Sequence, residues 1–331
     1  MALRTLSLPK DLQGLGEMLP QTFRYPDNPE WSIQSDEQEE LAGYVKAFRR
    51  MWPLFRALML VVPSFRDGMR GFVWEEKETL AAATLYHRLG STSCWDISTV
   101  GVLPDFRRRG LARQLIERTL QDIHGRGGKR ITLGVISENL PARSLYKSVG
   151  FEDFGGFVKY ESSPSAPPRI PALPEGYDAV RLKQFDWKTR YELARRITPT
   201  STAKYDPVTP GKFKEPLPIR PLIKFLLMIR GTVERSFAIR CRATGQVVGI
   251  GHYSVPKRGK GMSRLGVRLD PEHGELADYI VKRLLSTCVT LNPGRRIEIS
   301  IRHWMGDVIS AAEAANMERR VDNRRMGLLL D

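Results

Sequence analysis

The sequence predicts an α/β protein of two tandem domains, each a mixed, mainly antiparallel sheet flanked by helices. Three observations lead there: the length of 331 residues, a proline-rich stretch near the middle, and an order of elements that the second half repeats. At roughly 100–200 residues per domain, this length favours two domains that each bury a core. Five prolines within 162–174 remove backbone donors and favour an extended course. We therefore expect a first domain over 1–161, a linker over 162–175 and a second domain over 176–331.

Strand-like and helical stretches alternate in the later part of the first domain, which indicates a mixed sheet. The expected strands are 2–7, 70–74, 80–88, 95–103, 130–136 and a closing pair that starts at Phe151 and Phe157. The expected helices are 10–19, 37–60, 140–149 and one that begins after Gly110, where apolar residues from Ala112 to Ile123 recur at helical spacing.

The second half repeats this order at an offset of 166 residues. The matching stretches are 130–133 with 296–299, and 144–152 with 310–318. The register slips by a residue or two at the preceding helix, where 102–105 faces 268–272. Two similar domains in tandem are the simplest explanation.

The composition excludes several classes of protein. With 41% hydrophobic residues and no apolar run near the roughly 18 residues that a membrane span needs, we expect no membrane partner. The amino terminus lacks an apolar signal core, so a cytoplasmic location is expected. Cys94, Cys241 and Cys288 cannot all pair, and none has zinc-site spacing, so neither a disulfide framework nor a metal is expected.

The net charge of +15 is concentrated in the second half of the chain. Residues 1–165 carry 22 Lys and Arg against 20 Asp and Glu, whereas residues 166–331 carry 30 against 17. This asymmetry indicates either a surface for nucleic acid or an anionic ligand, or a solvated basic face. No basic run is interleaved with stacking aromatics, so a nucleic-acid partner is allowed but not favoured.

The most informative stretch is 100–112, a strand followed by a basic loop that opens a helix. The first turn of a helix has unpaired amide donors and a partial positive charge, and the small residues Gly110 and Ala112 let a phosphate approach those amides. About 30 residues later, a second motif spans 139–151. The loop within 100–112, with these unpaired amides, therefore suits a pyrophosphate.

Together the two segments resemble the GNAT superfamily of acyl-CoA-dependent N-acetyltransferases. Residues 107–112 match its motif (Gln or Arg)-x-x-Gly-x-(Gly or Ala), and residues 139–151 match Asn-x-x-Ala-x-x-Leu-Tyr-x-x-x-Gly-Phe. The resemblance covers about residues 1–161. Residues 178–331 look like a degenerate copy, because the loop 270–277 has glutamates instead of arginines and Ala312 stands at the place of Tyr146.

The resemblance implies that acetyl-CoA is the cosubstrate and assigns residues to it. The loop amides would hold the pyrophosphate, and the strand edge and Asn139 would bind the pantetheine arm. The residues implied in coenzyme binding are Val100, Gly101, Val102, Arg107, Arg108, Arg109, Gly110, Leu111, Ala112, Asn139, Ala142 and Arg143.

Two residues are expected in catalysis. The resemblance makes Tyr146 the group that protonates the departing thiolate; the alternative is a core tyrosine. Asp96 is the best candidate for the base that deprotonates the amine. It lies four residues before Val100, so alternation predicts the same face of the strand, and its short side chain favours a water relay. A structural aspartate is the alternative, and His87 is a weaker reserve.

The resemblance implies an acceptor cleft that is lined by 20–60 and 151–160. Its candidates are Phe23, Tyr25, Trp31, Asp36, Glu37, Glu39, Glu40 and Trp52, which would suit a cationic amine or, for the acidic residues, would form a solvated helix start. The proline-rich segment 198–222 is expected to be a surface insertion or a wall that covers this cleft.

The expected activity is acetyl transfer from acetyl-CoA to the primary amine of a small molecule or peptide, by direct attack. No cysteine falls within the motifs to form an acyl-enzyme. The rivals are a metabolite-sensing module with a basic second domain, and an acyltransferase that uses a longer acyl-CoA.

Overall fold

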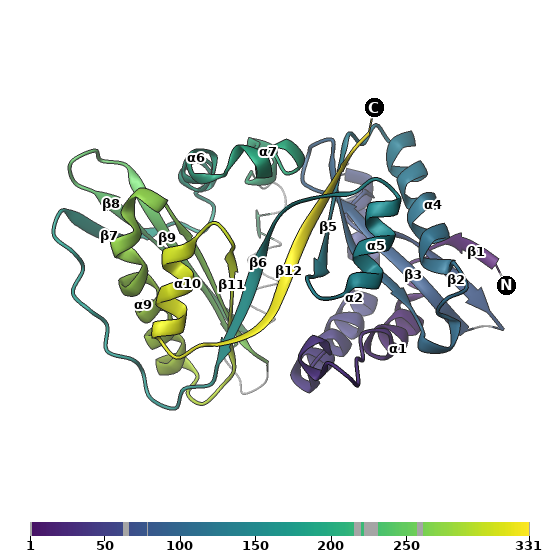
Figure 1. Cartoon of the computed structure of the whole chain (residues 1–331), viewed down its shortest axis with the longest axis horizontal. Coiled ribbons are helices and arrows are strands. Elements are labelled where there is room, and N and C mark those ends of the chain that lie inside the picture. The colour runs from purple at the N-terminus through teal and green to yellow at the C-terminus, as the bar shows by residue number, and fades with distance from the viewer. Residues whose placement is uncertain are drawn as a thin grey trace. The chain divides into compact units, whose positions relative to one another are not determined.

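A computed structural model of the chain describes residues 2–61, 66–77, 79–214, 220–221, 231–256 and 261–330. These residues form two compact units, each with its own core (Figure 1). Unit 1 comprises Met1–Phe154 and Arg324–Asp331, and unit 2 comprises Gly155–Asn323. Both units contain a mixed, mainly antiparallel sheet with helices, so the predicted fold class is confirmed. None of the described helices is long and apolar enough to cross a membrane.

Unit 1 is built on a sheet whose strands follow the chain order and end with a strand from the carboxyl terminus. The strands are β1 (Ala2–Thr5), β2 (Arg70–Glu76), β3 (Thr79–Arg88), β4 (Cys94–Val102), β5 (Arg130–Ile136) and the end of β12 (Glu318–Leu329). The helices are α1 (Leu12–Thr22), α2 (Ser35–Val61), α4 (Leu111–Gly125) and α5 (Leu140–Ser148), with short 3-10 turns η1 (Pro29–Trp31) and η2 (Pro104–Phe106). The pairing of β4 with β5 is parallel, whereas β1 to β4 pair antiparallel.

Alternation along the strands gives the sheet of unit 1 two apolar faces. On β2, Val73 packs with Leu15 and Met18 of α1, while its neighbour Phe72 packs with Leu115 of α4. Helices α1 and α2 also pack against each other (Figure 1). The helix that follows the basic loop therefore covers one face, and the two amino-terminal helices belong to the other.

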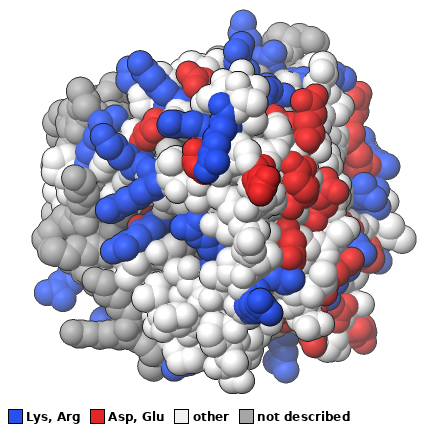
Figure 2. Space-filling view, turned by 90° about the vertical axis from the view of Figure 1, so that its left-hand side faces the viewer, with Lys and Arg blue, Asp and Glu red and all other residues white. Residues whose placement is uncertain are grey.

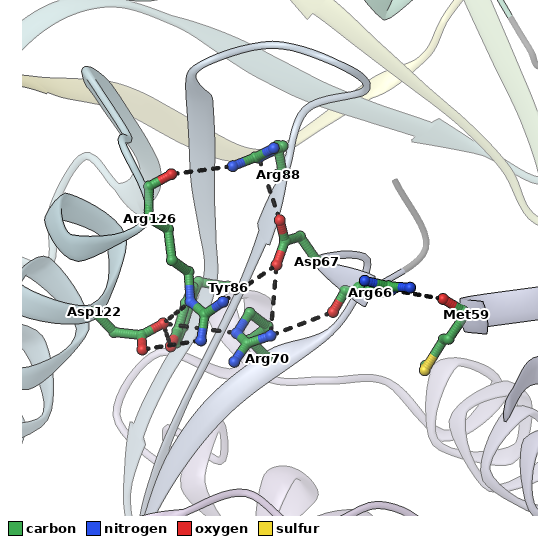
Figure 3. A network of polar contacts seen from close by, with 8 residues as sticks. All are labelled: Met59, Arg66, Asp67, Arg70, Tyr86, Arg88, Asp122 and Arg126. Atoms are coloured by element: carbon green, nitrogen blue, oxygen red, sulfur yellow. Dashed lines mark hydrogen bonds and ion pairs between the residues drawn. The ribbon is translucent and has the colours of Figure 1, made fainter. Parts of the chain in front are cut away.

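A polar network fixes the carboxyl-terminal end of α4 (Figure 3). Asp122 accepts hydrogen bonds from the Tyr86 hydroxyl at 2.7 Å and from Arg126 Nε at 2.6 Å. Burial alone would raise the pKa of Asp122, but these two donors outweigh it and hold that pKa below its usual value. Asp67 joins the network through ion pairs to Arg88 and Arg126. The network thus ties the end of α4 to β3.

The carboxyl terminus completes the sheet of unit 1. Strand β12 lies beside β5, the Leu330 amide donates to the Lys129 carbonyl at 3.0 Å, and Met326 is fully buried among the residues that pack on α4. Strand β6 (Glu152–Ser162) instead pairs with a strand of unit 2, from Ser162↔Ile297 to Phe157↔Arg302. The first unit therefore ends at Phe154 rather than at residue 161, and it is discontinuous in sequence.

The repeat explains this arrangement. Strand β6 begins at Glu152 and β12 at Glu318, two positions that the predicted offset superimposes, so the two strands are the same element in the two copies. The strand that follows the second copy lies beside β5 and completes the sheet of the first copy. The predicted linker 162–175 consequently joins β6 to β7 within unit 2 instead of joining the two units.

Unit 2 has the sheet order β12, β6, β11, β10, β9, β8, β7. The further strands are β7 (Tyr177–Leu182), β8 (Thr232–Cys241), β9 (Val247–Pro256), β10 (Ser263–Leu269) and β11 (Ile297–Arg302). The helices are α6 (Trp187–Ile197), α7 (Thr200–Tyr205), α9 (Ala277–Leu291) and α10 (Gly306–Ala314), with 3-10 turns η3 (Pro210–Lys212) and η5 (Pro271–Leu276). Helices α9 and α10 begin and end 166 residues after α4 and α5, so the predicted repeat is confirmed. The expected slip of register at the first of these helices is wrong, because α9 keeps the offset at both ends.

Candidate active site

Strand β4 separates from β5 halfway along its length. The parallel pairing joins 94–97 to 130–133 and ends there, although β4 stays paired with β3 as far as Val102. Ser98 is an extra residue in the pairing with β3, where the register shifts, and its hydroxyl donates to the Leu85 carbonyl at 3.2 Å. Such a bulge bends a strand. The β5-facing edge of 98–102 is therefore available for a ligand that binds as an added strand.

The loop after β4 presents the start of α4 to the same opening. Gly110 has φ +76° and is the N-cap residue of α4, which has no side-chain cap. The first backbone bond of the helix runs from the Gln114 amide to the Gly110 carbonyl, so the amides of 111–113 have no acceptor within the helix. Arg108 also has a positive φ, +62°. The loop thus has the unpaired donors that bind an anion.

The three arginines of the loop differ in their contacts. Arg107 Nη2 donates to the Thr22 carbonyl at 2.9 Å. Arg109 lies over the Phe106 ring, 5.0 Å from its centroid. Arg108 is exposed. Arg108 is therefore the arginine with the fewest contacts to its own chain.

Gly101 lets α1 approach β4 closely. A Cβ atom at this position would lie 2.7 Å from Thr22 Cγ2, which is closer than packed atoms come. Because α1 ends at Thr22, the loop that follows it starts beside β4. That loop carries Tyr25, whose amide donates to Ser32 Oγ at 2.9 Å. Gly101 therefore has a packing role in addition to its place on the strand edge.

Tyr146 projects from α5 into the core of unit 1. Its side chain is 7% exposed and meets Phe151 edge-on, with ring centroids 6.2 Å apart. Burial raises the pKa of Tyr146, and the nearby Tyr25 adds to this. Among the described residues its hydroxyl has no hydrogen-bond partner. Tyr25 in turn lies close to Arg107 and Asn139, so the loop after α1, the loop after β4 and the start of α5 meet at Tyr25.

The start of α5 uses several of the predicted coenzyme residues for its own structure. Asn139 Oδ1 accepts from the Ala142 amide at 3.2 Å and caps the helix. Arg143 donates to the Ser137 carbonyl at 2.9 Å and lies 3.4 Å from an oxygen of Asp153. The Asn139 side chain also hydrogen-bonds Tyr25, so a ligand that uses its amide nitrogen would replace Tyr25 as the partner.

Asp96 does not share a face with Val100, and the prediction that it does is wrong. Asp96 pairs with His87 and Val100 pairs with Thr84. His87 and Thr84 are three residues apart on β3, so they and their partners lie on opposite faces. The bulge at Ser98 breaks the alternation that the prediction assumed. Asp96 and His87 instead lie side by side on the face that α1 covers.

The Asp96 carboxylate is bound by two groups. Its Oδ1 accepts from Thr132 Oγ1 at 2.7 Å and from Arg325 Nη2 at 2.7 Å, and the Asp96 and Arg325 side chains are 14% and 16% exposed. Sequence analysis missed Arg325 because it comes from the carboxyl-terminal strand. The internal repeat could have indicated Arg325. It occupies the same position in its copy as Lys159, and Lys159 forms an ion pair with the buried Glu298 of unit 2 at 3.1 Å.

Most acceptor candidates have local partners. Glu37 Oε2 accepts from the Gln34 amide at 2.8 Å, close to the start of α2, as a solvated helix start predicts. Trp31 meets Tyr25 edge-on at 5.6 Å. The side chains of Asp36 and Glu40 lie outside the described residues.

The corresponding loop of unit 2 is acidic. Asp270 Oδ1 accepts from the Glu272 amide at 3.2 Å. A Cβ atom on Gly274 would lie 2.4 Å from Asp307 Oδ2, so a carboxylate lies against the turn before α9. Ala312, fully buried, stands where unit 1 has Tyr146. Unit 2 therefore lacks both the cationic loop and the phenol.

Part of the chain is similar in sequence to known acetyltransferases. Residues 11–151 match the sequence model of the Acetyltransferase (GNAT) family. A mycothiol acetyltransferase of Beutenbergia cavernae is 29% identical over 96 residues, which are 29% of this chain and 32% of that protein. A [ribosomal protein bS18]-alanine N-acetyltransferase of Salmonella typhimurium is 41% identical over 54 residues, 16% of this chain and 36% of that protein. The chain thus spans about a third of the length of these curated relatives.

Solved structures resemble the whole chain. A tandem GNAT protein from the clavulanic acid biosynthesis pathway has a TM-score of 0.63 at 13% identity, covering 99% of this chain and 98% of that one. A GCN5-related N-acetyltransferase from Sphaerobacter thermophilus has a TM-score of 0.64 at 15% identity, covering 99% and 95%. The chain therefore has the tandem GNAT fold, and its residues 11–151 are similar in sequence to the GNAT acetyltransferase family.

Proposed function

We propose that unit 1 transfers the acetyl group of acetyl-CoA to a primary amine by direct attack. The observation that carries the proposal is the separation of β4 from β5 beside an uncapped helix start. A coenzyme A molecule offers an amide-containing arm to the open strand edge and a pyrophosphate to the helix amides. The residues present therefore fit this cosubstrate.

Each part of the opening has a separate role in this proposal. The amides of 111–113 and the Arg108 side chain would bind the pyrophosphate, and the backbone of 98–102 would pair with the pantetheine arm. The Asn139 side-chain nitrogen would donate to the same arm. Acetyl-CoA supplies an activated thioester, and the acceptor nitrogen attacks its carbonyl carbon.

Tyr146 is the proposed general acid. Because burial raises the pKa of its hydroxyl, the phenol stays protonated at neutral pH and can give its proton to the departing sulfur. Its hydroxyl has no competing partner among the described residues. The nearby Tyr25 raises the pKa of that hydroxyl further.

The amine must lose a proton before it attacks, and Asp96 is the proposed acceptor of that proton through water. Its Oδ1 already holds Thr132 and Arg325, so only Oδ2 is left for such a relay. His87, directly opposite on β3, is the second candidate for the same proton. We infer that the amine approaches from the face on which both residues lie.

The acceptor is proposed as a small-molecule or peptide amine. The two relatives are named for acceptors of different kinds, one for mycothiol and the other for an alanine of a ribosomal protein. An assay of free thiol released from acetyl-CoA with a panel of both kinds of amine identifies the class. Succinyl-CoA in the same panel tests the preference for acetyl.

A pair of glycine variants tests the binding site. Gly110→Ala places a side chain at φ +76° in the loop, and Gly127→Ala places one at φ +71° just beyond the other end of α4, with no atom within 4 Å. Both variants carry similar backbone strain, roughly 1–2 kcal/mol. We expect coenzyme A to bind Gly110→Ala about tenfold more weakly or worse, since a charge-assisted bond contributes about 1.5–3 kcal/mol, and Gly127→Ala to bind it normally.

Calorimetry with coenzyme A measures both variants. Equal affinities for the two would show that the helix start does not hold the pyrophosphate. A wild-type protein that binds coenzyme A but releases no thiol with any amine would instead favour the sensing module.

A further inference from the structure

Unit 2 contains a large pocket that the proposed acetyl transfer does not use. Its volume is about 1210 Å³, and its lining residues run from Arg181 to Met305. Strands β8, β9 and β10 contribute residues to it, as do α6 and the segment 198–213. The described part of the proline-rich segment 198–222 thus lines a pocket within unit 2; residues 215–219 and 222 lie outside the described residues. Its expected contact with the cleft of the first domain stays a prediction.

The lining is strongly basic. The lining contains seven Lys and Arg residues and two acidic residues. One of the acidic residues, Asp206, already pairs with Lys212. The seven are Arg181, Lys183, Arg190, Lys212, Arg235, Arg268 and Arg302. Figure 2 shows that Lys and Arg gather in one part of the face it presents, while Asp and Glu gather in another. The excess charge of the second half therefore includes a concave cluster.

Arg268 carries the argument for a ligand. It extends from β10, and its guanidinium lies over the Phe213 ring at 5.6 Å. Among the described residues it has no hydrogen bond and no carboxylate partner. Burial lowers its pKa, and the neighbouring Arg190 and Arg302 lower it further. Three cations close together in a partly desolvated pocket repel one another, and a bound anion would relieve that repulsion.

Polar groups beside Arg268 add hydrogen-bonding capacity. The Ser236 hydroxyl meets His252 Nδ1 at 3.0 Å and accepts from Arg190 Nη2 at 3.2 Å. Burial lowers the pKa of His252, as do Arg190 and Arg268, so its ring is neutral at pH 7. Gly266 stands opposite His252 in the sheet and leaves the space above β10 open. The floor of the pocket is therefore polar and accessible.

Apolar groups form other parts of the wall. They are Leu182, Phe185, Ile197, Val208, Phe213, Ile250 and Trp304. A basic cluster and aromatic rings in one cavity match a small molecule with a charged end and an apolar body, and the cavity exceeds the roughly 300–1,000 Å³ that such ligands usually occupy. The acidic turn before α9 is a separate feature, so this pocket is not a second copy of the coenzyme loop.

We propose that unit 2 binds a small molecule bearing an oxyanion, either phosphate or carboxylate, with that group held by Arg268, Arg190 and Arg302. The planar guanidinium of an arginine can donate two parallel hydrogen bonds to such a group. The rest of the ligand lies against Phe213 and Trp304. This site is independent of the acetyl-transfer chemistry proposed for unit 1.

Titration of the full chain with inorganic pyrophosphate and, separately, with citrate tests the proposal. Arg268→Gln removes the central charge, and Arg240→Gln, an exposed arginine on β8 outside the pocket, is the matched control. We expect at least one of the two anions to bind wild type and Arg240→Gln equally. We expect Arg268→Gln to bind that anion about tenfold to a hundredfold more weakly, the effect of one or two charge-assisted bonds. Whichever anion binds distinguishes a phosphate from a carboxylate ligand.

The readout must separate the pocket from the loop of unit 1, which also attracts phosphate. The pocket component is the part of the calorimetric signal that Arg268→Gln removes while coenzyme A binding stays the same. Arg302→Gln is a second variant that reports on the same site if Arg268→Gln does not fold. Equal anion affinity in wild type and both pocket variants, an equal loss in Arg240→Gln, or no binding of either anion would overturn the proposal.

Discussion

Met326 offers a direct test of how the chain builds its first unit. It is fully buried in the core of unit 1, although it lies near the carboxyl terminus. Met317, nine residues earlier on the same segment, is 4% exposed and belongs to the core of unit 2. Truncation of a buried methionine to alanine costs about 2–5 kcal/mol, so we expect about 3 kcal/mol from Met326→Ala. This loss of folding free energy should affect unit 1 rather than unit 2.

Hydrogen exchange followed by mass spectrometry locates the loss. A destabilisation of about 3 kcal/mol raises the exchange rate of amides that open with their unit roughly 100-fold, because 1.4 kcal/mol is a factor of ten. For Met326→Ala this acceleration should appear in peptides from α4 and β5, and for Met317→Ala in peptides from α9 and β11. If Met326→Ala accelerates hydrogen exchange in unit 2 as much as in unit 1, the carboxyl-terminal strand does not complete the core of the first unit.

Two further outcomes follow from named contacts. In a double-mutant cycle of Asp96→Asn and Arg325→Gln, measured by urea denaturation, we expect a coupling of about 2 kcal/mol because both side chains are largely buried; a coupling near zero would mean that the pair is not a structural link. The pKa of Asp122 is lowered in the fold, so its charged form stabilises the protein above the unfolded pKa of about 4, and this contribution is lost as the pH falls through the lower folded value. The stability difference between wild type and Asp122→Asn should therefore shrink on acidification below pH 4, and a constant difference would refute the role of the Arg126 and Tyr86 bonds.

The local elements were predictable because their signals are local. Helix α4 begins at Leu111, one residue after the glycine that the motif requires, and α5 begins one residue after Asn139, which caps it. The internal repeat correctly predicted where α10 begins, and α9 follows the same offset without the expected slip. Periodicity, caps and internal similarity can all be recognised in the sequence itself, so they predict local elements without knowledge of the tertiary structure.

Two errors have a physical cause that the sequence does not carry locally. The face of Asp96 was wrong because the bulge at Ser98 depends on how β4 bends away from β5. The first domain was assigned the wrong last strand because β6 and β12 are the same element in the two copies, and the repeat alone does not say which sheet each strand joins. Which copy takes which strand is decided by tertiary packing. For the same reason, Arg325 was not expected beside Asp96.

The sequence did not decide whether the positive charge of the second half forms a binding surface or a solvated face. Its charge count gives no position in space, and only the fold brings side chains from Arg181 to Arg302 around one cavity. Arg268 lies on β10 and Arg302 on β11, and the whole of α9 separates them in sequence, so no local motif joins them.

The turnover of Tyr146→Phe tests the central claim of acetyl transfer in unit 1 most directly. The phenyl ring keeps the packing against Phe151, and the lost hydroxyl has no partner among the described residues, so folding and coenzyme A affinity should be preserved. With an accepted amine, thiol release should fall by roughly 10²–10⁴-fold, the usual effect of removing a general acid. Unchanged turnover at unchanged coenzyme A affinity would contradict the assignment and leave Tyr146 as a packing residue.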